Sequence, residues 1–416
     1  MKLALIAALA AALAGCQTTD RAFSTVDRTL AVITSPTARV LTTVAKASDP
    51  KSALKEGLRS RKQVYAQNPY ALVQDIRAVK RDYDNLTSLL RGNVGKKWGR
   101  KEIRLPSRTH YIKYTQNYKS RAIVDFDAGQ VTVETVDEKD PRLSLGNAIV
   151  TTLLTPNDPR AVDLFSDSAV TLTSAKEPYL FGLVVDQNGK PVGMPAEAES
   201  FAAYLIENRA ATRAVELEDG RKSALYVKFP LVANFEDRQV EKYRGLVNKY
   251  AGRYQISPSL VYAIIRTESN FNPFAVSSAP AYGLMQLVPG SGGREAYRRA
   301  KGDDDIPTRQ YLFDAENNIE LGTAYLNVLT YNRLERVGSP VAREYCVISA
   351  YNTGPSNVLR VFSRDRAEAV NAINRMQPPG VYEKLRAACR TRRPGNIWSR
   401  SSTPAGSTSR GRTKAP

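Results

Sequence analysis

The pattern of apolar residues changes near Asp237. Before that residue some segments alternate and others repeat every three or four positions, whereas after it only the helical period is found. Ser257-Pro258 begins the clearest helix, because Ser is a good N-cap and Pro fits the first turn. Further helices are expected at about 316–334, 340–351 and 355–363. The sequence therefore predicts an α+β protein, with a mixed N-terminal domain followed by a mainly α-helical domain.

The N-terminal domain is expected over residues 55–232, with no obvious chemistry of its own. Its predicted elements are a helix from Pro69 that ends at Gly92, a hairpin of 122–126 and 131–136, a helix at 143–154, a strand at 179–185 ending at an Asn188-Gly189 turn, a helix at 201–210 and a strand at 224–229. Such a domain would serve as an accessory module.

The N-terminus is expected to be a targeting signal. Met1-Lys2 precedes a short apolar stretch, which is typical of a secretory signal and too short to span a membrane stably. The stretch ends in Leu13-Ala14-Gly15-Cys16, which resembles a lipobox, in which cleavage before Cys16 is followed by its lipidation. Gln17 rather than Asp then suggests the outer membrane. We expect residues 1–15 to be a signal peptide, 16–54 to be lipid anchor and tether, and the protein to face the periplasm; an ordinary signal with a coincidental cysteine is the alternative.

The composition favours some binding partners and disfavours some kinds of catalytic site. Lys and Arg outnumber Asp and Glu by 60 to 41, so anionic partners are favoured, including nucleic acid, acidic lipid and wall polymers. Three cysteines without a CxxC pair and the single His110 do not favour a zinc site, and no nucleophile motif accompanies that histidine. We therefore expect no metal and no cofactor.

One carboxylate stands at the end of an apolar helical stripe. Leu260, Ile264 and Glu268 lie four residues apart on one helical face. Desolvation at the end of such a stripe disfavours the anion and raises the pKa, so that the group can act as an acid near neutral pH. On spacing alone, a solvent-exposed glutamate at a helix end explains the pattern better.

Three short motifs favour a functional role for Glu268 instead. Glu268-Ser-Asn-Phe-Asn-Pro273, Gly283-Leu-Met-Gln286 and Ala350-Tyr-Asn-Thr-Gly354 together resemble the soluble lytic transglycosylase family, which has a lysozyme-like fold, and Gly322-Thr-Ala-Tyr-Leu326 also fits it. Residues 114–136 and the stretch from Lys176 are similar to the accessory domain of the membrane-bound lytic murein transglycosylase C family. The resemblance covers about residues 70–386 and places a lysozyme-like catalytic domain at 233–386.

The resemblance implies a mechanism with one carboxylate. Glu268 would protonate the bond between N-acetylmuramic acid and N-acetylglucosamine, and then take the proton from the 6-hydroxyl that closes a 1,6-anhydro ring. Glycosidases with two carboxylates differ from this scheme. No second carboxylate follows Glu268 until Glu295, although Asp314, Glu316 and Glu320 remain open as partners. Asp314 looks more like the start of a helix.

Other roles follow from the same resemblance. Ser277 would orient the muramic acid, with a plain loop serine as its alternative, and Gln286 would hydrogen-bond the sugar. Met285 would pack rather than contact substrate, Tyr351 would hold or orient Glu268, and Asn352 would fix its turn. The expected partners are peptidoglycan glycan strands, the outer membrane through Cys16 and, through the accessory domain, a cell-wall synthesis complex.

The C-terminal end departs from the family. The helix Arg-x-Tyr-Leu-x-Lys-Val, whose tyrosine enters the site, is absent, and a basic stretch expected to be disordered occupies 387–416. One allowed coding of residues 396–400 contains Tyr-Leu-Val-Lys in another frame, so we hypothesise a frameshift between about Leu385 and Pro394. An oxidising periplasm would also allow a Cys346–Cys389 disulfide.

Two other functions remain open on the sequence. A lysozyme-type hydrolase on the same fold would add water and leave reducing ends. A non-catalytic tether between peptidoglycan and outer membrane would explain the missing tyrosine helix, but the complete motifs around Glu268 and Gln286 favour an enzyme. A nucleic-acid binder would explain the charge, yet a lipid-anchored periplasmic address argues against it.

Overall fold

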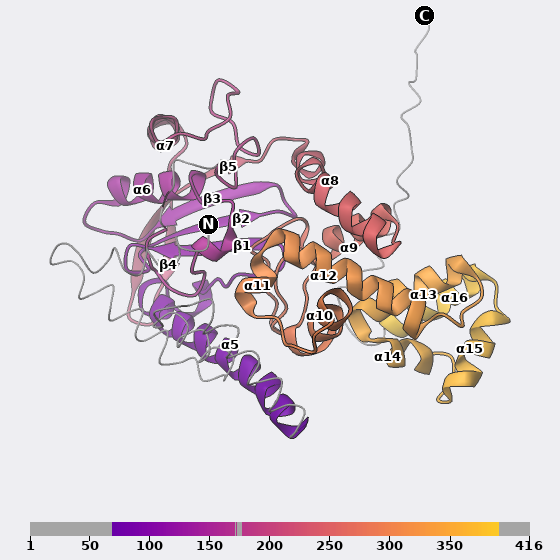
Figure 1. Ribbon diagram of the computed structural model, residues 1–416. Helices are drawn as coiled ribbons and strands as arrows, with labels where there is room; N and C mark the ends of the chain where they lie inside the picture. The colour runs from indigo at the N-terminus through magenta and orange to yellow at the C-terminus, as the bar shows by residue number, and fades with distance from the viewer. Residues whose placement is uncertain (1–68, 171, 173–176, 391–416) are drawn as a thin grey trace, which may run out of the picture.

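The computed structural model of the protein describes residues 69–170, 172 and 177–390. A sheet flanked by helices lies at one side of the molecule, and helices α8 to α16 lie at the other (Figure 1). The predicted order, a mixed α+β part followed by a helical part, is confirmed. The signal peptide, Cys16, the tether and 391–416 lie outside the described residues. Residues 387–390, which were expected in the disordered tail, form the end of a helix instead.

Five antiparallel strands form the sheet. They are β1 (His110–Thr115), β2 (Ser120–Asp125), β3 (Gln130–Thr135), β4 (Ala211–Glu216) and β5 (Arg221–Pro230), in the order β1-β2-β3-β5-β4. The predicted hairpin is β2–β3, where Val124 lies opposite Val131 and Ala122 opposite Val133. All four of these side chains are buried, as the alternation predicted, and the expected last strand is β5.

In the part of the chain that the structure describes, three helices and two short 3-10 turns accompany the sheet. They are α5 (Pro69–Trp98), η1 (Arg100–Glu102), α6 (Pro141–Leu153), η2 (Pro159–Ala161) and α7 (Pro195–Asn208). Helices α6 and α7 agree with their predictions within a few residues, except that α7 begins six residues earlier. The predicted end of α5 at Gly92 is wrong. Leu90, Val94 and Trp98 continue its stripe in the core, and that burial outweighs the roughly 1 kcal/mol that a glycine costs inside a helix.

The predicted strand at 179–185 is also wrong. This segment forms turns, with isolated bridges from Phe181 to Val184 and from Val185 to Pro191. Tyr179, Leu180, Leu183 and Val184 are buried, whereas Phe181 is exposed, and Gly182 has a left-handed φ of 72° that turns the backbone. An apolar run predicts burial and cannot by itself predict a ladder of hydrogen bonds. The Asn188-Gly189 turn is present, with φ of 77° at Gly189.

The named elements of the second part are all helical in the residues described, and the segment from 270 to 288 forms turns with isolated β-bridges. Its elements are α8 (Phe235–Tyr254), α9 (Pro258–Ser269), the π-helical turn η3 (Pro289–Gly293), α10 (Arg294–Lys301), α11 (Arg309–Phe313), α12 (Ala315–Val328), the π-helical turn η4 (Leu329–Arg333), α13 (Pro340–Thr353), α14 (Pro355–Arg360), α15 (Arg366–Asn374) and α16 (Pro378–Arg390). The helices expected at 316–334, 340–351 and 355–363 are therefore present. Asp314 caps α12 by accepting a hydrogen bond from Asn317 N, whereas the Ser257 side chain makes no capping bond.

Helix α12 is the centre of the helical part. Every residue from Asn318 to Val328 is buried, and α8, α10 and α13 pack around it. Among the helices described here, none is long and apolar enough to cross a membrane. Cys346 in α13 is a buried free thiol, and the side chain of Cys389 lies outside the described part.

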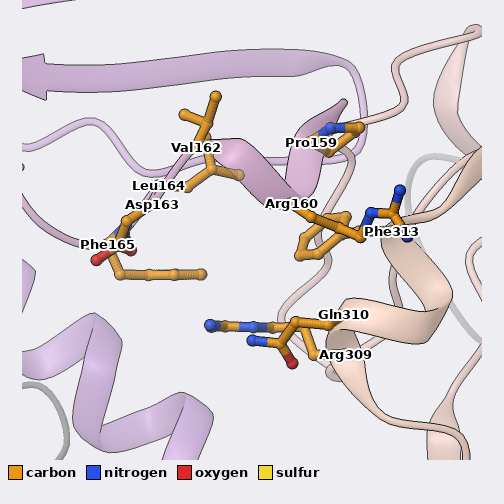
Figure 2. Close-up of a pocket in the computed structure, with 9 residues that line it drawn as sticks. All are labelled: Pro159, Arg160, Val162, Asp163, Leu164, Phe165, Arg309, Gln310 and Phe313. Atoms are coloured by element: carbon orange, nitrogen blue, oxygen red, sulfur yellow. Dashed lines mark hydrogen bonds between the residues drawn. The ribbon is translucent and has the colours of Figure 1, made fainter. Parts of the chain in front are cut away.

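Among the described residues, the contacts between the two parts include the two that follow. In the first, Phe274 of the helical part lies between Tyr111 and Tyr179 of the other, with ring centroids 4.8 and 5.1 Å apart. In the second, Arg160 of η2 pairs with Asp314 at 3.0 Å. Arg160 also lines a small cavity of about 40 Å³ between η2 and α11, together with Arg309, Phe165 and Phe313 (Figure 2).

Candidate active site

Glu268 lies in the last turn of α9 and is buried. The stripe beneath it is also buried, since Leu260 is 8%, Ile264 2% and Glu268 itself 4% exposed. After the helix the chain turns sharply, because Asn270 and Phe271 both adopt left-handed φ angles, of 47° and 62°. The carboxyl group is thus held at a rigid corner, away from bulk water.

Burial sets the acidity of Glu268, and one cation opposes it. Desolvation raises the pKa of Glu268 above its usual value, while the charge of Arg108 and the side-chain amide of Asn352 lower it, with a net rise. Arg108 Nη1 donates to Oε2 of Glu268 at 3.2 Å. Oε1 has no hydrogen-bond partner among the described residues. One oxygen is therefore held, and the other is left for a new partner.

Arg108 is a functional candidate that the sequence reasoning missed. It comes from the loop before β1, 160 positions before Glu268, in a domain predicted to have no obvious chemistry. The chain has 60 lysines and arginines, and no motif distinguishes this one. Only its contact with Glu268 in the folded structure identifies it as a candidate.

The Gly283–Gln286 motif forms a tight turn that Asn318 holds from within. Asn318 Nδ2 donates to the carbonyls of Tyr282 and Leu312, and its Oδ1 accepts from Met285 N at 2.7 Å. Gly283 has φ of 75°, and a Cβ there would lie 2.5 Å from Asn318 Nδ2. Ser269 next to Glu268 donates to the carbonyl of Leu284 in this turn. The turn and the end of α9 are thus joined.

Gln286 is buried, and within the described chain its amide nitrogen has hydrogen-bond partners while its amide oxygen has none. Its Nε2 donates to the carbonyls of Ala275 and Gly283, both at 3.0 Å. Its Oε1 has no partner within the described chain. A buried acceptor without a donor is costly unless a ligand supplies one.

Tyr351 and Asn352 approach from α13. The Tyr351 hydroxyl donates to the carbonyl of Met285 at 2.8 Å, and no hydrogen bond to Glu268 is found in the described part. Burial raises the pKa of Tyr351 well above its usual value, and the negative charge of Glu268 raises it further. Tyr351 therefore supports the turn and lies near the carboxyl group, and Met285 itself is fully buried.

Ser277 is placed differently from the other candidates. Its Oγ donates to the carbonyl of Ala279 at 2.5 Å, and its backbone N–H donates to Ala281. Both bonds lie within its own loop. The structure thus brings Glu268, Met285, Gln286 and Tyr351 together, whereas Ser277 is held in a neighbouring loop.

The other carboxylates that remained open have partners elsewhere. Asp314 caps α12 and pairs with Arg160, Glu316 pairs with Lys249, Glu320 pairs with Arg253 and Lys301, and Glu295 pairs with Arg333. None of these ion pairs includes Glu268. In the described residues these four carboxylates are therefore paired with other cations, whereas Glu268 pairs with Arg108.

Gly322 of α12 allows Met285 to pack under the turn. A Cβ at Gly322 would lie 2.2 Å from Met285 Sδ. We expect Gly322→Ala to lower the free energy of unfolding by about 1–3 kcal/mol, because overpacking a core costs that much. Gly252→Ala is the matched control: Gly252 is a helical glycine with open space around it, so the change should raise the value by about 0.5–1 kcal/mol. Chemical denaturation measures both, and equal stability of Gly322→Ala and wild type would contradict the packing argument.

Comparison with known proteins gives two family models and several relatives. The model described as membrane-bound lytic murein transglycosylase C, N-terminal domain, matches residues 66–242, and the transglycosylase SLT domain matches residues 245–374. Proteins named membrane-bound lytic murein transglycosylase C are similar to this chain. The one from Sodalis glossinidius is 43% identical over 73% of this chain and 83% of its own length, and the one from Salmonella arizonae is 42% identical over 73% and 82%.

One solved structure is also similar over part of the chain. It is an inactive mutant of the lytic transglycosylase Slt from Pseudomonas aeruginosa, 25% identical, covering 35% of this chain and 22% of its own, with a TM-score of 0.26.

Proposed function

The chain belongs to the family of membrane-bound lytic murein transglycosylase C, and from that membership we propose that it is a lytic transglycosylase of peptidoglycan. It cleaves the bond from N-acetylmuramic acid to N-acetylglucosamine without water and leaves a 1,6-anhydro-N-acetylmuramic acid end. The observation that carries the proposal is Glu268, a buried carboxyl group with a raised pKa, one free oxygen and no second carboxylate beside it in the described part.

The proposed reaction uses the same carboxyl group twice. Protonated Glu268 gives its proton from Oε1 to the glycosidic oxygen, so that N-acetylglucosamine leaves with the bonding electron pair. The 2-acetamido group of the muramic acid stabilises the positive charge at C1. Glu268, now a carboxylate next to Arg108, takes the proton of the C6 hydroxyl as that oxygen bonds to C1. One glycosidic bond breaks, one forms, and the starting protonation state returns.

The other site residues bind and orient in this proposal. The free Oε1 of Gln286 accepts an N–H or O–H of the sugar, which supplies the donor that this buried oxygen lacks. Asn352 stays close to Glu268, and Ser277 guides the muramic acid from its loop. Met285 and Tyr351 hold the turn that carries Gln286.

We further propose that Cys16 anchors the protein in the outer membrane, facing the periplasm. Support comes from the Leu13-Ala14-Gly15-Cys16 sequence and from relatives that are named membrane-bound. A cell-wall synthesis complex is the proposed partner of the exposed face of the N-terminal domain.

The test is the chemistry of the products. Protein lacking residues 1–16 is incubated with purified sacculi, and the released fragments are analysed by mass spectrometry. Products one water lighter than hydrolytic ones are expected. Hydrated reducing ends would identify a lysozyme-type hydrolase, and binding to sacculi without release would identify a tether; both would overturn the proposal.

A further inference from the structure

We propose that Arg108 of the N-terminal domain is a positioning residue that holds Oε2 of Glu268 and leaves Oε1 to the substrate. This inference rests on the proposed function, because it assigns a role in that reaction. It departs from the expectation of an accessory domain that only docks the enzyme.

The loop that carries Arg108 is fixed by the loop that follows Glu268. Asn272 Nδ2 donates to the carbonyl of Arg108 itself at 3.1 Å. Val276 N donates to the carbonyl of Ser107 at 3.3 Å. These two hydrogen bonds fix the backbone of Arg108 relative to the segment that follows Glu268. The 3.2 Å ion pair between Arg108 and Glu268 is therefore supported by backbone contacts between the two domains.

The corner after Glu268 depends in turn on the N-terminal domain. Asn270 ends α9 in a left-handed conformation, and its Nδ2 donates to the carbonyl of Phe126, just after β2, at 2.6 Å. A buried side-chain amide without that carbonyl would lose a strong bond. Phe274 packs on the far side against Tyr111 of β1. The direction in which α9 presents its carboxyl group is thus set from the neighbouring domain.

Arg108 is the cation that faces Glu268 from the N-terminal domain. From α13 the neutral amide of Asn352 and the neutral phenol of Tyr351 complete the surroundings. The attraction of Arg108 favours the carboxylate and opposes desolvation, and it is weakened because the Arg108 side chain is 38% exposed. Glu268 must be an acid in one step and a base in the next. A cation that moderates the effect of burial keeps both forms accessible.

The experiment compares three variants with wild type: Arg108→Met, Arg108→Lys and the control Arg104→Met. Arg104 is an exposed arginine on the same segment, and the structure shows bonds only to its backbone. kcat and KM are measured across pH on soluble glycan strands, and thermal melting confirms that each variant folds.

Arg108→Met should lower kcat roughly tenfold or more with little change in KM, because general acid–base catalysis is worth about 10²–10⁴ and depends on orientation. Its alkaline limb of kcat/KM should move to higher pH, because loss of the cation raises the pKa of Glu268. Arg108→Lys should keep the limb close to wild type, and Arg104→Met should behave as wild type. A merely structural role would lower the rate without moving the limb.

Two outcomes would overturn the proposal. An Arg108→Met enzyme with an unchanged rate and pH profile would show that the contact is idle. Higher activity at every pH would show that Arg108 obstructs the site. To separate this inference from the proposed function, the Glu268 signal is followed by carbon NMR of glutamate-labelled protein, assigned with Glu268→Gln. A lower Glu268 pKa in wild type than in Arg108→Met is expected even if no anhydro product forms, and equal values would refute the ion pair.

Discussion

Glu268→Gln is expected to reduce the release of anhydro-ended fragments from sacculi by about 10³-fold or more, because the amide can neither give nor take the proton and general acid–base catalysis is worth about 10²–10⁴. The shape of the side chain is kept, and a carboxyl group whose pKa is raised by burial is removed. The thermal midpoint should therefore be unchanged or higher, and binding to sacculi should persist. Mass spectrometry of the products and a melting curve measure both effects.

The matched control for that variant is Glu295→Gln. Glu295 is the next carboxylate along the chain and is paired with Arg333 rather than with Glu268. It should keep wild-type activity. If Glu268→Gln retained a tenth of the rate, or if Glu295→Gln were equally impaired, a different acid would have to be sought.

Asn318→Ala is expected to lower the free energy of unfolding by about 2–5 kcal/mol, because it removes the Asn318 partner of two buried backbone groups at about 1–3 kcal/mol each and one of the two hydrogen bonds of a third. The two groups are Met285 N and the carbonyl of Leu312, and the third is the carbonyl of Tyr282, which keeps its hydrogen bond from Leu287 N. Activity should fall as well, since the turn that places Gln286 loses its internal support. Denaturant titration and the sacculus assay measure the two losses.

The neighbouring Asn317→Ala serves as its control. Asn317 lies on the same helix, and its backbone N–H bonds to the Asp314 cap, which the change preserves. Its stability should stay within about 0.5 kcal/mol of wild type. A small effect at Asn318 would mean that the turn does not depend on these hydrogen bonds.

The sequence predicted those elements whose burial follows a simple period. The stripe under Glu268 and the alternation in β2 and β3 are of this kind. Strand β1 was missed because Tyr111, Ile112, Lys113 and Tyr114 are all buried, so that no alternation remains. Lys113 is buried because its ammonium group donates to the carbonyls of Asp163 and Ser166, contacts that only the fold supplies.

The candidate site was predictable to the extent that its residues stand in contiguous motifs. Glu268, Gln286 and Tyr351 were found in that way, and the structure brings them together. The hydrogen bond of Tyr351 to the Met285 carbonyl, and the approach of Arg108 from another domain, depend on distances between segments that the sequence does not encode locally. Strand β4, whose side chains are mostly exposed, gave too weak a pattern to be predicted.

The ion pair between the two domains limits how the domains can be exchanged between related proteins. A catalytic helix whose counter-ion sits in a different module cannot be transplanted onto another accessory domain without losing that charge. Recombination that exchanged one half of such a gene would produce an enzyme with a displaced working pH, even if both halves folded perfectly. The two domains are therefore expected to be inherited together in evolution. A chimaeric wall enzyme would need Arg108 as well as the Glu268 that it contacts.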